Sequence, residues 1–224
     1  MDFNGVIIND EPIQMKAYQQ VLKGDGIDLT DADYYSSLGT DDRSFTMNAF
    51  KRAGKSVSDS KVDEIVAAKS AKWREMVDGE LPLFDGIENF IEKMSRVFSL
   101  GIVSMASRHE IEYVLEKGGL AHHFDVLISA EDVAKCKPDP DCFRLGFAQL
   151  DAARTSAGHL PMAHSECLVI EDSPPGVISA TTAGLQALGV TNTVSAKDLR
   201  DAGAAAVAND LNDWMPESIR RIFV

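Results

Sequence analysis

Cys167-Leu168-Val169-Ile170-Glu171-Asp172-Ser173 is a run of four apolar residues that ends in two carboxylates and a hydroxyl. A short apolar run of this kind is typical of a strand buried on both faces of a parallel sheet. A helix is predicted directly after it, over about 176–183. Glu171 and Asp172 are therefore expected at the carboxyl end of a strand, where open α/β sheets bind their ligands.

The same alternation of apolar runs and amphipathic stretches extends to both sides of this segment. We predict strands at 98–103 and 124–128, weaker strands at 186–190 and 205–208, and helices at 110–117 and 141–150. Strands that alternate with helices form a parallel sheet with helices on both faces. The sequence therefore predicts an α/β protein whose core is a Rossmann-like, doubly wound parallel sheet.

Residues 13–82 have a different pattern, with no convincing strand. Helices are predicted at 15–22, 31–37, 42–52 and 61–77. Thr30 and either Ser58 or Asp59 are suitable N-cap residues for two of them. A helical block of this kind indicates a cap over the ligand-binding edge of the sheet. We therefore predict two domains: a core of residues 1–12 and 83–224, and an inserted α-helical cap of residues 13–82.

The 224 residues carry a formal net charge of −13. Nucleic acid and anionic membrane surfaces repel such a protein, so we expect neither as a partner. A small anionic metabolite remains possible, because a metal ion or a local cation can outweigh the mean charge. The three cysteines form no C-x-x-C pair, which suits a reducing compartment, and no secretory leader is visible. We expect a cytoplasmic protein that is a monomer or a homodimer.

Polar residues fall near the predicted strand ends at four places along the chain. Asp2 and Asn4 lie at the start, Ser104 follows the strand at 98–103, and Lys137 follows the next strand by several residues. Glu171-Asp172 is the fourth place. Residues two apart on an extended segment face the same side, so Asp2 and Asn4 can address one cavity. The four signals predict a single site at one edge of the sheet.

In these motifs the chain resembles the haloacid dehalogenase superfamily. Within it, the similarity is to the β-phosphoglucomutase-like and phosphoglycolate phosphatase-like group, whose helical cap follows the first motif. The resemblance covers essentially the whole chain, and its strongest motifs are Lys137-Pro138-Asp139-Pro140 and Glu171-Asp172. It implies a Mg²⁺-dependent phosphatase that acts on a small phosphorylated metabolite. Asp2 is the implied nucleophile, which forms an aspartyl-phosphate intermediate.

The resemblance also implies which residues bind metal and substrate. Mg²⁺ is expected on Asp2, Asp172 and the main-chain carbonyl of Asn4, with Glu171 supporting the metal shell. The substrate-binding residues implied are Ser104, Met105, Lys137 and, from the cap, Arg43. Lys137 neutralises the phosphoryl group. For Arg43 the alternative is a solvated helix start capped by Asp41 or Asp42.

Asn4 departs from the family pattern, which usually has a second aspartate here as general acid and base. Losing such a group typically lowers the rate by about 10²–10⁴-fold. We therefore expect slow turnover of alkyl phosphates, or natural substrates with good leaving groups. Asp10 or Glu11 is an alternative base. A second departure is that only Met1 precedes Asp2, where the family has an apolar strand; we expect the native start to lie upstream.

Three functions stay open at this point. The leading one is a phosphatase that releases inorganic phosphate. A phosphomutase of the β-phosphoglucomutase type passes the phosphoryl group to a sugar hydroxyl instead, and a requirement for a bisphosphate activator would indicate it. The third is a catalytically impaired phosphate-binding or regulatory protein, in which Asn4 in place of the usual aspartate has removed catalytic turnover.

Overall fold

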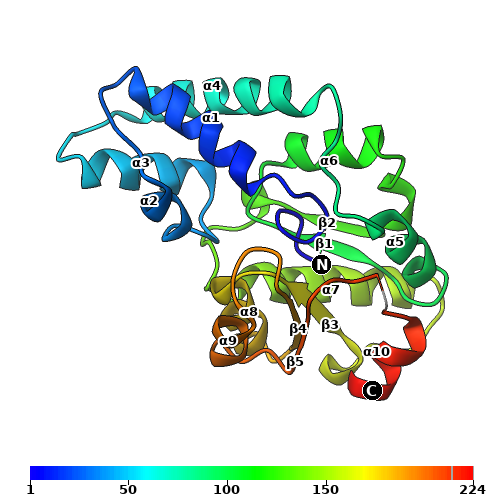
Figure 1. Cartoon of the computed structure of the whole chain (residues 1–224). Helices are drawn as coiled ribbons and strands as arrows, with labels where there is room; N and C mark the ends of the chain where they lie inside the picture. Colours follow the sequence, from blue (N-terminus) through cyan, green and yellow to red (C-terminus); the bar gives the residue numbers. More distant parts are fainter. Residues whose placement is uncertain (213, 224) are drawn as a thin grey trace.

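The computed structural model describes residues 1–212 and 214–223 and shows an α/β fold (Figure 1). Every strand pairing in this described part is parallel. One sheet has the order β1-β2 and the other has the order β3-β4-β5. The strands are β1 (Gly101–Val103), β2 (Val126–Ile128), β3 (Leu168–Glu171), β4 (Gln186–Val190) and β5 (Ala206–Ala208). Each lies inside or beside a predicted strand, and most are shorter than predicted.

The first two residues of the chain lie between the two sheets. The Met1 amino group donates to the Gly101 carbonyl at 2.7 Å, and Val103 N–H donates to the Met1 carbonyl at 2.9 Å. On the other side, Asp2 N–H donates to the Ile170 carbonyl at 2.9 Å. Met1 and Asp2 thus form hydrogen bonds with both sheets without being assigned as a strand. These bonds place Asp2 among the carboxyl ends of β1 and β3.

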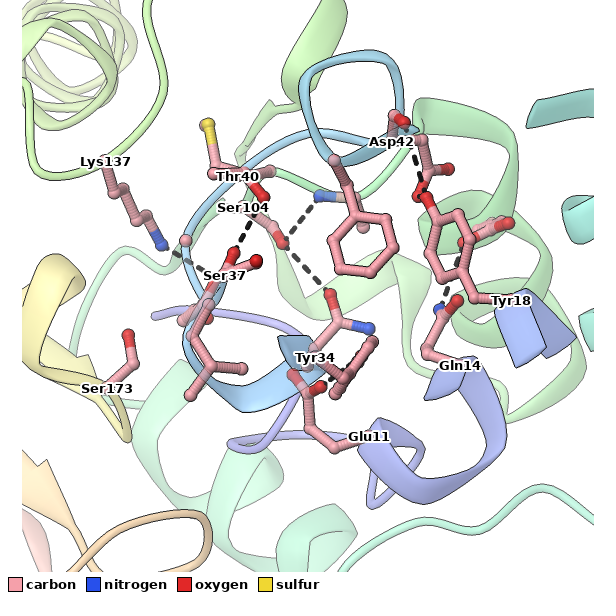
Figure 2. Close-up of a pocket in the computed structure, with 18 of the residues that line it drawn as sticks. Glu11, Gln14, Tyr18, Tyr34, Ser37, Thr40, Asp42, Ser104, Lys137 and Ser173 are labelled. Atoms are coloured by element: carbon pink, nitrogen blue, oxygen red, sulfur yellow. Dashed lines mark hydrogen bonds and ion pairs between the residues drawn. The ribbon is translucent and has the colours of Figure 1, made fainter. Parts of the chain in front are cut away.

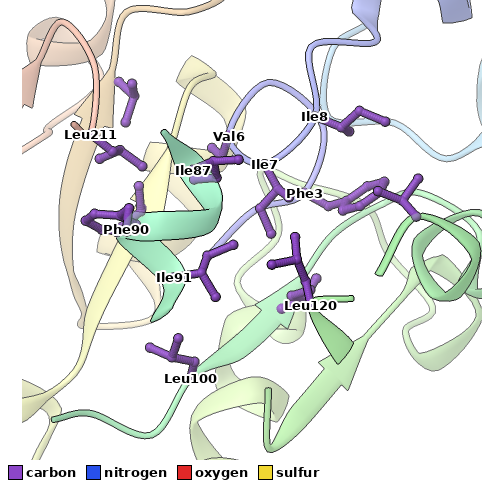
Figure 3. Packing of buried hydrophobic residues seen from close by; sticks show 14 of the residues in the cluster. Phe3, Val6, Ile7, Ile8, Ile87, Phe90, Ile91, Leu100, Leu120 and Leu211 are labelled. Carbon is purple, nitrogen blue, oxygen red and sulfur yellow. The ribbon is translucent and has the colours of Figure 1, made fainter. Parts of the chain in front are cut away.

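Helices cover both faces of the strands, as predicted. Successive strand residues point to opposite faces, so Ile102 and Ile170 belong to one hydrophobic cluster while Val103 and Val169 belong to another. The first cluster includes α5 (Ile87–Ser95), α6 (Arg108–Lys117) and α10 (Pro216–Phe223), and the second includes α7 (Asp141–Ser156), α8 (Pro174–Thr182) and α9 (Ala196–Asp201). Figure 3 shows part of the first cluster. Short 3₁₀ helices occupy Ala121–His123, Ala130–Asp132 and His164–Glu166.

The remaining helices form a block beside the strands (Figure 1). They are α1 (Glu11–Lys23), α2 (Asp31–Tyr35), α3 (Asp42–Arg52) and α4 (Asp59–Val77). Side chains of Thr30, Asp41 and Ser58 accept backbone N–H groups at the starts of α2, α3 and α4. The block has a hydrophobic cluster of its own, in which the rings of Tyr18 and Phe45 lie 4.1 Å apart. The division of the chain after residue 12 and before residue 83 stays a prediction.

Among the described helices, none combines the length and the apolar character that crossing a bilayer requires.

Candidate active site

The loop after Asp2 turns sharply at Gly5, which has a φ of +73°. A Cβ atom at this position would lie 1.9 Å from Asp172 Oδ2. Only glycine tolerates both the left-handed backbone and this approach. The loop therefore brings Asp2, at the start of the chain, against Asp172 at the end of β3.

Lys137 is buried between the carboxylates of two distant segments. Its Nζ donates to Asp2 Oδ1 at 2.9 Å, to Glu171 Oε1 at 2.6 Å and to the Val103 carbonyl at 3.1 Å. Burial alone lowers the pKa of Lys137, but the charges of Asp2 and Glu171 outweigh it and raise the pKa above its usual value. Lys137 is therefore a permanent cation at the base of the site.

The Glu171 side chain is fully engaged. While Oε1 accepts from Lys137, Oε2 accepts from Ser173 Oγ at 3.0 Å and from the N–H groups of Asp172 and Ser173. A Cβ atom at Gly176 would lie 1.9 Å from the Glu171 carboxyl carbon, so α8 approaches this side chain closely. Glu171 is thereby fixed behind the site, where it orients Lys137.

Asp172 is held by a residue that sequence reasoning missed. Thr193 Oγ1 donates to Asp172 Oδ2, and the neighbouring Asn192 donates its amide to the Gly5 carbonyl at 2.8 Å. Both lie in the loop after β4, for which no role in the site was predicted. A threonine three residues past a strand end is a signal that could have been used, because that loop reaches the same edge of the sheet.

Three carboxylates meet at this point, and their arrangement fits a metal ion. Asp2, Glu171 and Asp172 each offer an oxygen within 4.8 Å of the others, and all three residues are buried. Burial, followed by the negative charges of Glu171 and Asp2, raises the pKa of Asp172 well above its usual range. A divalent cation would relieve this repulsion, and carboxylate oxygens are ligands that Mg²⁺ accepts.

Asn4 joins Ser104 to Asp10. Its Oδ1 accepts from Ser104 Oγ at 3.4 Å, and its Nδ2 donates to Asp10 Oδ1 at 2.9 Å. Asp10 is fully buried and also accepts from Gln14 and Trp73. It does not belong to the cavity lining, whereas Glu11 does. Of the two alternative bases, Glu11 is therefore the one that faces the cavity.

A cavity of about 90 Å³ opens above these groups, between the strand ends and the α1–α4 block (Figure 2). The predicted residues that line it are Asp2, Asn4, Ser104, Met105, Lys137 and Asp172. Glu171 lies behind it. The structure thus brings seven of the eight predicted site residues together.

Arg43 is the exception. Its guanidinium pairs with Asp59 at 3.5 Å and with Asp63, both on α4, and it is absent from the cavity lining of the described chain. Asp41 caps α3 by accepting from Ser44 N–H at 2.7 Å. The alternative interpretation, a capped and solvated helix start, describes this segment. The helix turns Arg43 toward α4 instead of toward the strand ends.

The side of the cavity formed by the α1–α4 block holds further polar residues that were not predicted. Lys69 is one of them, and its side chain is 2% exposed. It lies on the buried face of α4 together with Val62, Ile65 and Trp73. A lysine on an otherwise apolar helical stripe was a usable signal, because a buried ammonium group needs acidic partners.

The sequence model of a protein family described as "Haloacid dehalogenase-like hydrolase" matches residues 1–190. The chain therefore belongs to the haloacid dehalogenase-like hydrolase family, and the predicted superfamily and its hydrolase class are confirmed.

Relatives and solved structures agree with this assignment. Validoxylamine A 7'-phosphate phosphatase of Streptomyces hygroscopicus subsp. limoneus is 28% identical over 90% of this chain and 88% of its own length. Protein SUPPRESSOR OF QUENCHING 1, chloroplastic, of Arabidopsis thaliana is 28% identical over 95% of this chain, which spans only 19% of that protein. The crystal structure of β-phosphoglucomutase from Clostridium difficile matches with a TM-score of 0.85 and 21% identity, covering 99% of this chain and 94% of that one. The last similarity shows the fold.

Proposed function

We propose that this protein is a Mg²⁺-dependent phosphatase that acts on a small phosphorylated metabolite through an aspartyl-phosphate at Asp2. The observation that carries the proposal is the position of Lys137 Nζ. It contacts both Asp2 and Glu171, two of the three clustered carboxylates, under a cavity that extends to the α1–α4 block. A buried cation next to a carboxylate nucleophile is suited to a phosphoryl group, because it compensates the charge that the substrate brings. The phosphatase named among the relatives supports the same reaction.

The residues divide the work as follows. An Asp2 oxygen attacks phosphorus, and the bond between phosphorus and the leaving oxygen breaks. Lys137 and the Ser104 hydroxyl hold phosphoryl oxygens, and water then releases phosphate from Asp2. Asp2, Asp172 and the Asn4 carbonyl would hold Mg²⁺, with Glu171 supporting them, and the ion would reduce repulsion between the carboxylate and the phosphoryl group.

Asn4 limits which leaving groups this reaction releases efficiently. An amide does not donate a proton to the leaving oxygen, and here it is tied to Asp10 and Ser104. Leaving groups that are stable as anions, such as those of aryl and acyl phosphates, need that proton least. Alkyl phosphates are therefore turned over slowly.

The test is phosphate release from p-nitrophenyl phosphate and acetyl phosphate, with and without Mg²⁺, by the chain and by Asp2→Ala. Release that requires both Mg²⁺ and Asp2 supports the proposal. Release that survives Asp2→Ala would exclude Asp2 as the nucleophile.

The fixed Asn4 amide favours one second candidate, a phosphate-binding protein without turnover. That function would show as Mg²⁺-dependent binding of phosphate with no release from either ester.

A further inference from the structure

The cavity has a second end, formed by the cap and by the start of α6. Figure 2 shows Glu11, Gln14, Tyr18 and Tyr34 on the side away from Lys137. The residues of this cap end are Glu11, Gln14, Tyr18, Tyr34, Asp42, Lys69 and Glu110. The reaction proposed above uses none of them. They face whatever the phosphoryl group is attached to.

Lys69 brings no free positive charge to the cap end. Its Nζ lies 3.0 Å from Asp42 Oδ1 and 3.3 Å from Glu110 Oε1, so two carboxylates already neutralise it. Among the described residues that line the cavity, Lys69 and Lys137 are the two cations, and Lys137 is engaged with Asp2 and Glu171. A second anionic group on the ligand would therefore find no unpaired cation here.

The carboxylates of the cap end outnumber its single lysine. Glu11 accepts from Tyr34 OH at 2.5 Å, Asp42 accepts from Tyr18 OH at 2.5 Å, and Glu110 accepts from Ser70 Oγ at 2.7 Å. These neutral donors add no positive charge. Burial, followed by the neighbouring charge of Asp10, raises the pKa of Glu11 to about 7, which shows how poorly this region accommodates negative charge.

Gln14 offers an acceptor that the protein leaves unused. Its Nε2 donates to Asp10 Oδ2 at 2.9 Å and to Glu110 Oε2 at 3.3 Å. These bonds fix the orientation of the amide. Its Oε1 is buried and has no partner among the described residues. A buried acceptor of this kind requires a donor, and a hydroxyl group of a bound ligand supplies one.

We propose that the cap end is a subsite for the uncharged, hydroxyl-bearing end of a phosphomonoester and that it excludes a second phosphate group. The proposal rests on the proposed function, because it assumes that a phosphoryl group occupies the other end. It identifies the ligand class as phosphomonoesters with a single phosphate group and an uncharged, hydroxyl-bearing remainder. Those with an alkyl leaving group bind here and turn over slowly. It also separates the phosphatase from a mutase that needs a bisphosphate activator.

The probes are fructose 6-phosphate and fructose 1,6-bisphosphate, which differ only in the second phosphate. Their dissociation constants are measured by calorimetry with Mg²⁺ on the full chain carrying Asp2→Asn, which prevents turnover. We expect the bisphosphate to bind at least tenfold more weakly than the monophosphate. Equal or tighter binding of the bisphosphate overturns the proposal.

Glu110→Gln, added to the same chain, keeps the size of the side chain but leaves Lys69 less neutralised. It should reduce the preference for the monophosphate by about tenfold, since one unit charge at this range has an effect of that order. Glu64→Gln on the outer side of α4 removes the same charge from a residue whose side chain is 68% exposed. This control should leave the ratio of the two dissociation constants, bisphosphate to monophosphate, unchanged. A ratio that does not respond to Glu110→Gln, or responds equally to Glu64→Gln, contradicts the subsite.

Gln14→Leu gives a second, independent reading. It should weaken the binding of fructose 6-phosphate. The binding of methyl phosphate, which is too short to reach Gln14, should stay unchanged. Equal weakening of both overturns the role of Gln14. If neither ligand binds the folded chain, the proposed function itself fails, and this outcome is distinct from a bisphosphate that binds well.

Discussion

Lys137 Nζ lies 2.9 Å from Asp2 Oδ1, although 135 positions separate the two residues in the sequence. The contact joins the loop before α7 to the first residues of the chain, which themselves bond to both sheets. A charge pair this buried is expensive to break from one side, because the partner is left uncompensated. The pair is thus part of the fold as well as of the site.

Replacing Lys137 should therefore affect stability as well as activity. Lys137→Met leaves Asp2 and Glu171 buried without their cation, which should lower the free energy of unfolding by about 3–5 kcal/mol in the absence of Mg²⁺. Added Mg²⁺ should restore part of this loss. Urea denaturation with and without Mg²⁺ measures both effects. Lys135→Met is the control, because the Lys135 side chain is 68% exposed. A Lys137→Met chain as stable as the control would show that the pair contributes nothing.

Gly5 permits the approach of the first loop to Asp172, and substitution there should be severe. Gly5→Ala places a Cβ 1.9 Å from Asp172 Oδ2 at a φ of +73°. Gly54→Ala is a matched control, because Gly54 has a φ of +67° with nothing within 4 Å of the added atom. The control should cost about 1–2 kcal/mol through the backbone alone. Thermal denaturation should show a clearly larger loss for Gly5→Ala, and equal losses would contradict the close approach.

Thr193 should tune metal binding without touching the metal. Thr193→Val removes the hydroxyl that holds Asp172 Oδ2. Loss of such a supporting bond typically lowers metal affinity by about 10–100-fold. Calorimetric titration with Mg²⁺ measures it. Thr191→Val in the same loop is the control, because the Thr191 hydroxyl donates to the Asn209 carbonyl instead. Unchanged affinity in Thr193→Val would remove Thr193 from the site.

The raised pKa of Glu11 should make the stability of the fold depend on pH. Its pKa rises from 4.5 to about 7 on folding, so the folded chain holds this proton more tightly than the unfolded chain does. The resulting stabilisation is fully present below pH 4.5 and is lost as the pH rises toward 7. The unfolding free energy of the chain, relative to Glu11→Gln, should therefore fall between about pH 5 and 7 and level off above about pH 8. Urea denaturation across this range measures it, and a constant difference would contradict the raised pKa.

The core was predictable from the sequence because its signals are local. Apolar runs such as 167–170 fix buried strands, and the strand-end rule places the polar residues that follow them on one edge. The same reasoning predicted that Asp2, Ser104, Lys137 and Asp172 lie together, and all four line the cavity. The short helices α5, α9 and α10 were not predicted. Their lengths are nine, six and eight residues, which leaves little periodicity to recognise.

The part of the site contributed by the α1–α4 block was not predictable in the same way. Lys69 donates a hydrogen bond to Glu110, which is 41 positions away in the sequence, and Gln14 donates one to Glu110 from 96 positions away. These contacts depend on how the helical block docks on the strand ends, which no local pattern encodes. Arg43 shows the same limit, since the orientation of one helix decides whether its side chain meets the cavity or α4.

We propose that Asp2 is a working nucleophile and that Asn4 limits which phosphate esters it cleaves. The most direct test compares initial rates of Mg²⁺-dependent phosphate release from p-nitrophenyl phosphate and fructose 6-phosphate. The chain is assayed unchanged, as Asn4→Asp and as Asp2→Ala. We predict that the unchanged chain prefers the aryl ester and that Asn4→Asp raises the rate on the sugar phosphate by about 10²-fold or more. Asp2→Ala should abolish both. Equal rates of the unchanged chain and Asn4→Asp on the sugar phosphate would contradict a limiting role of Asn4.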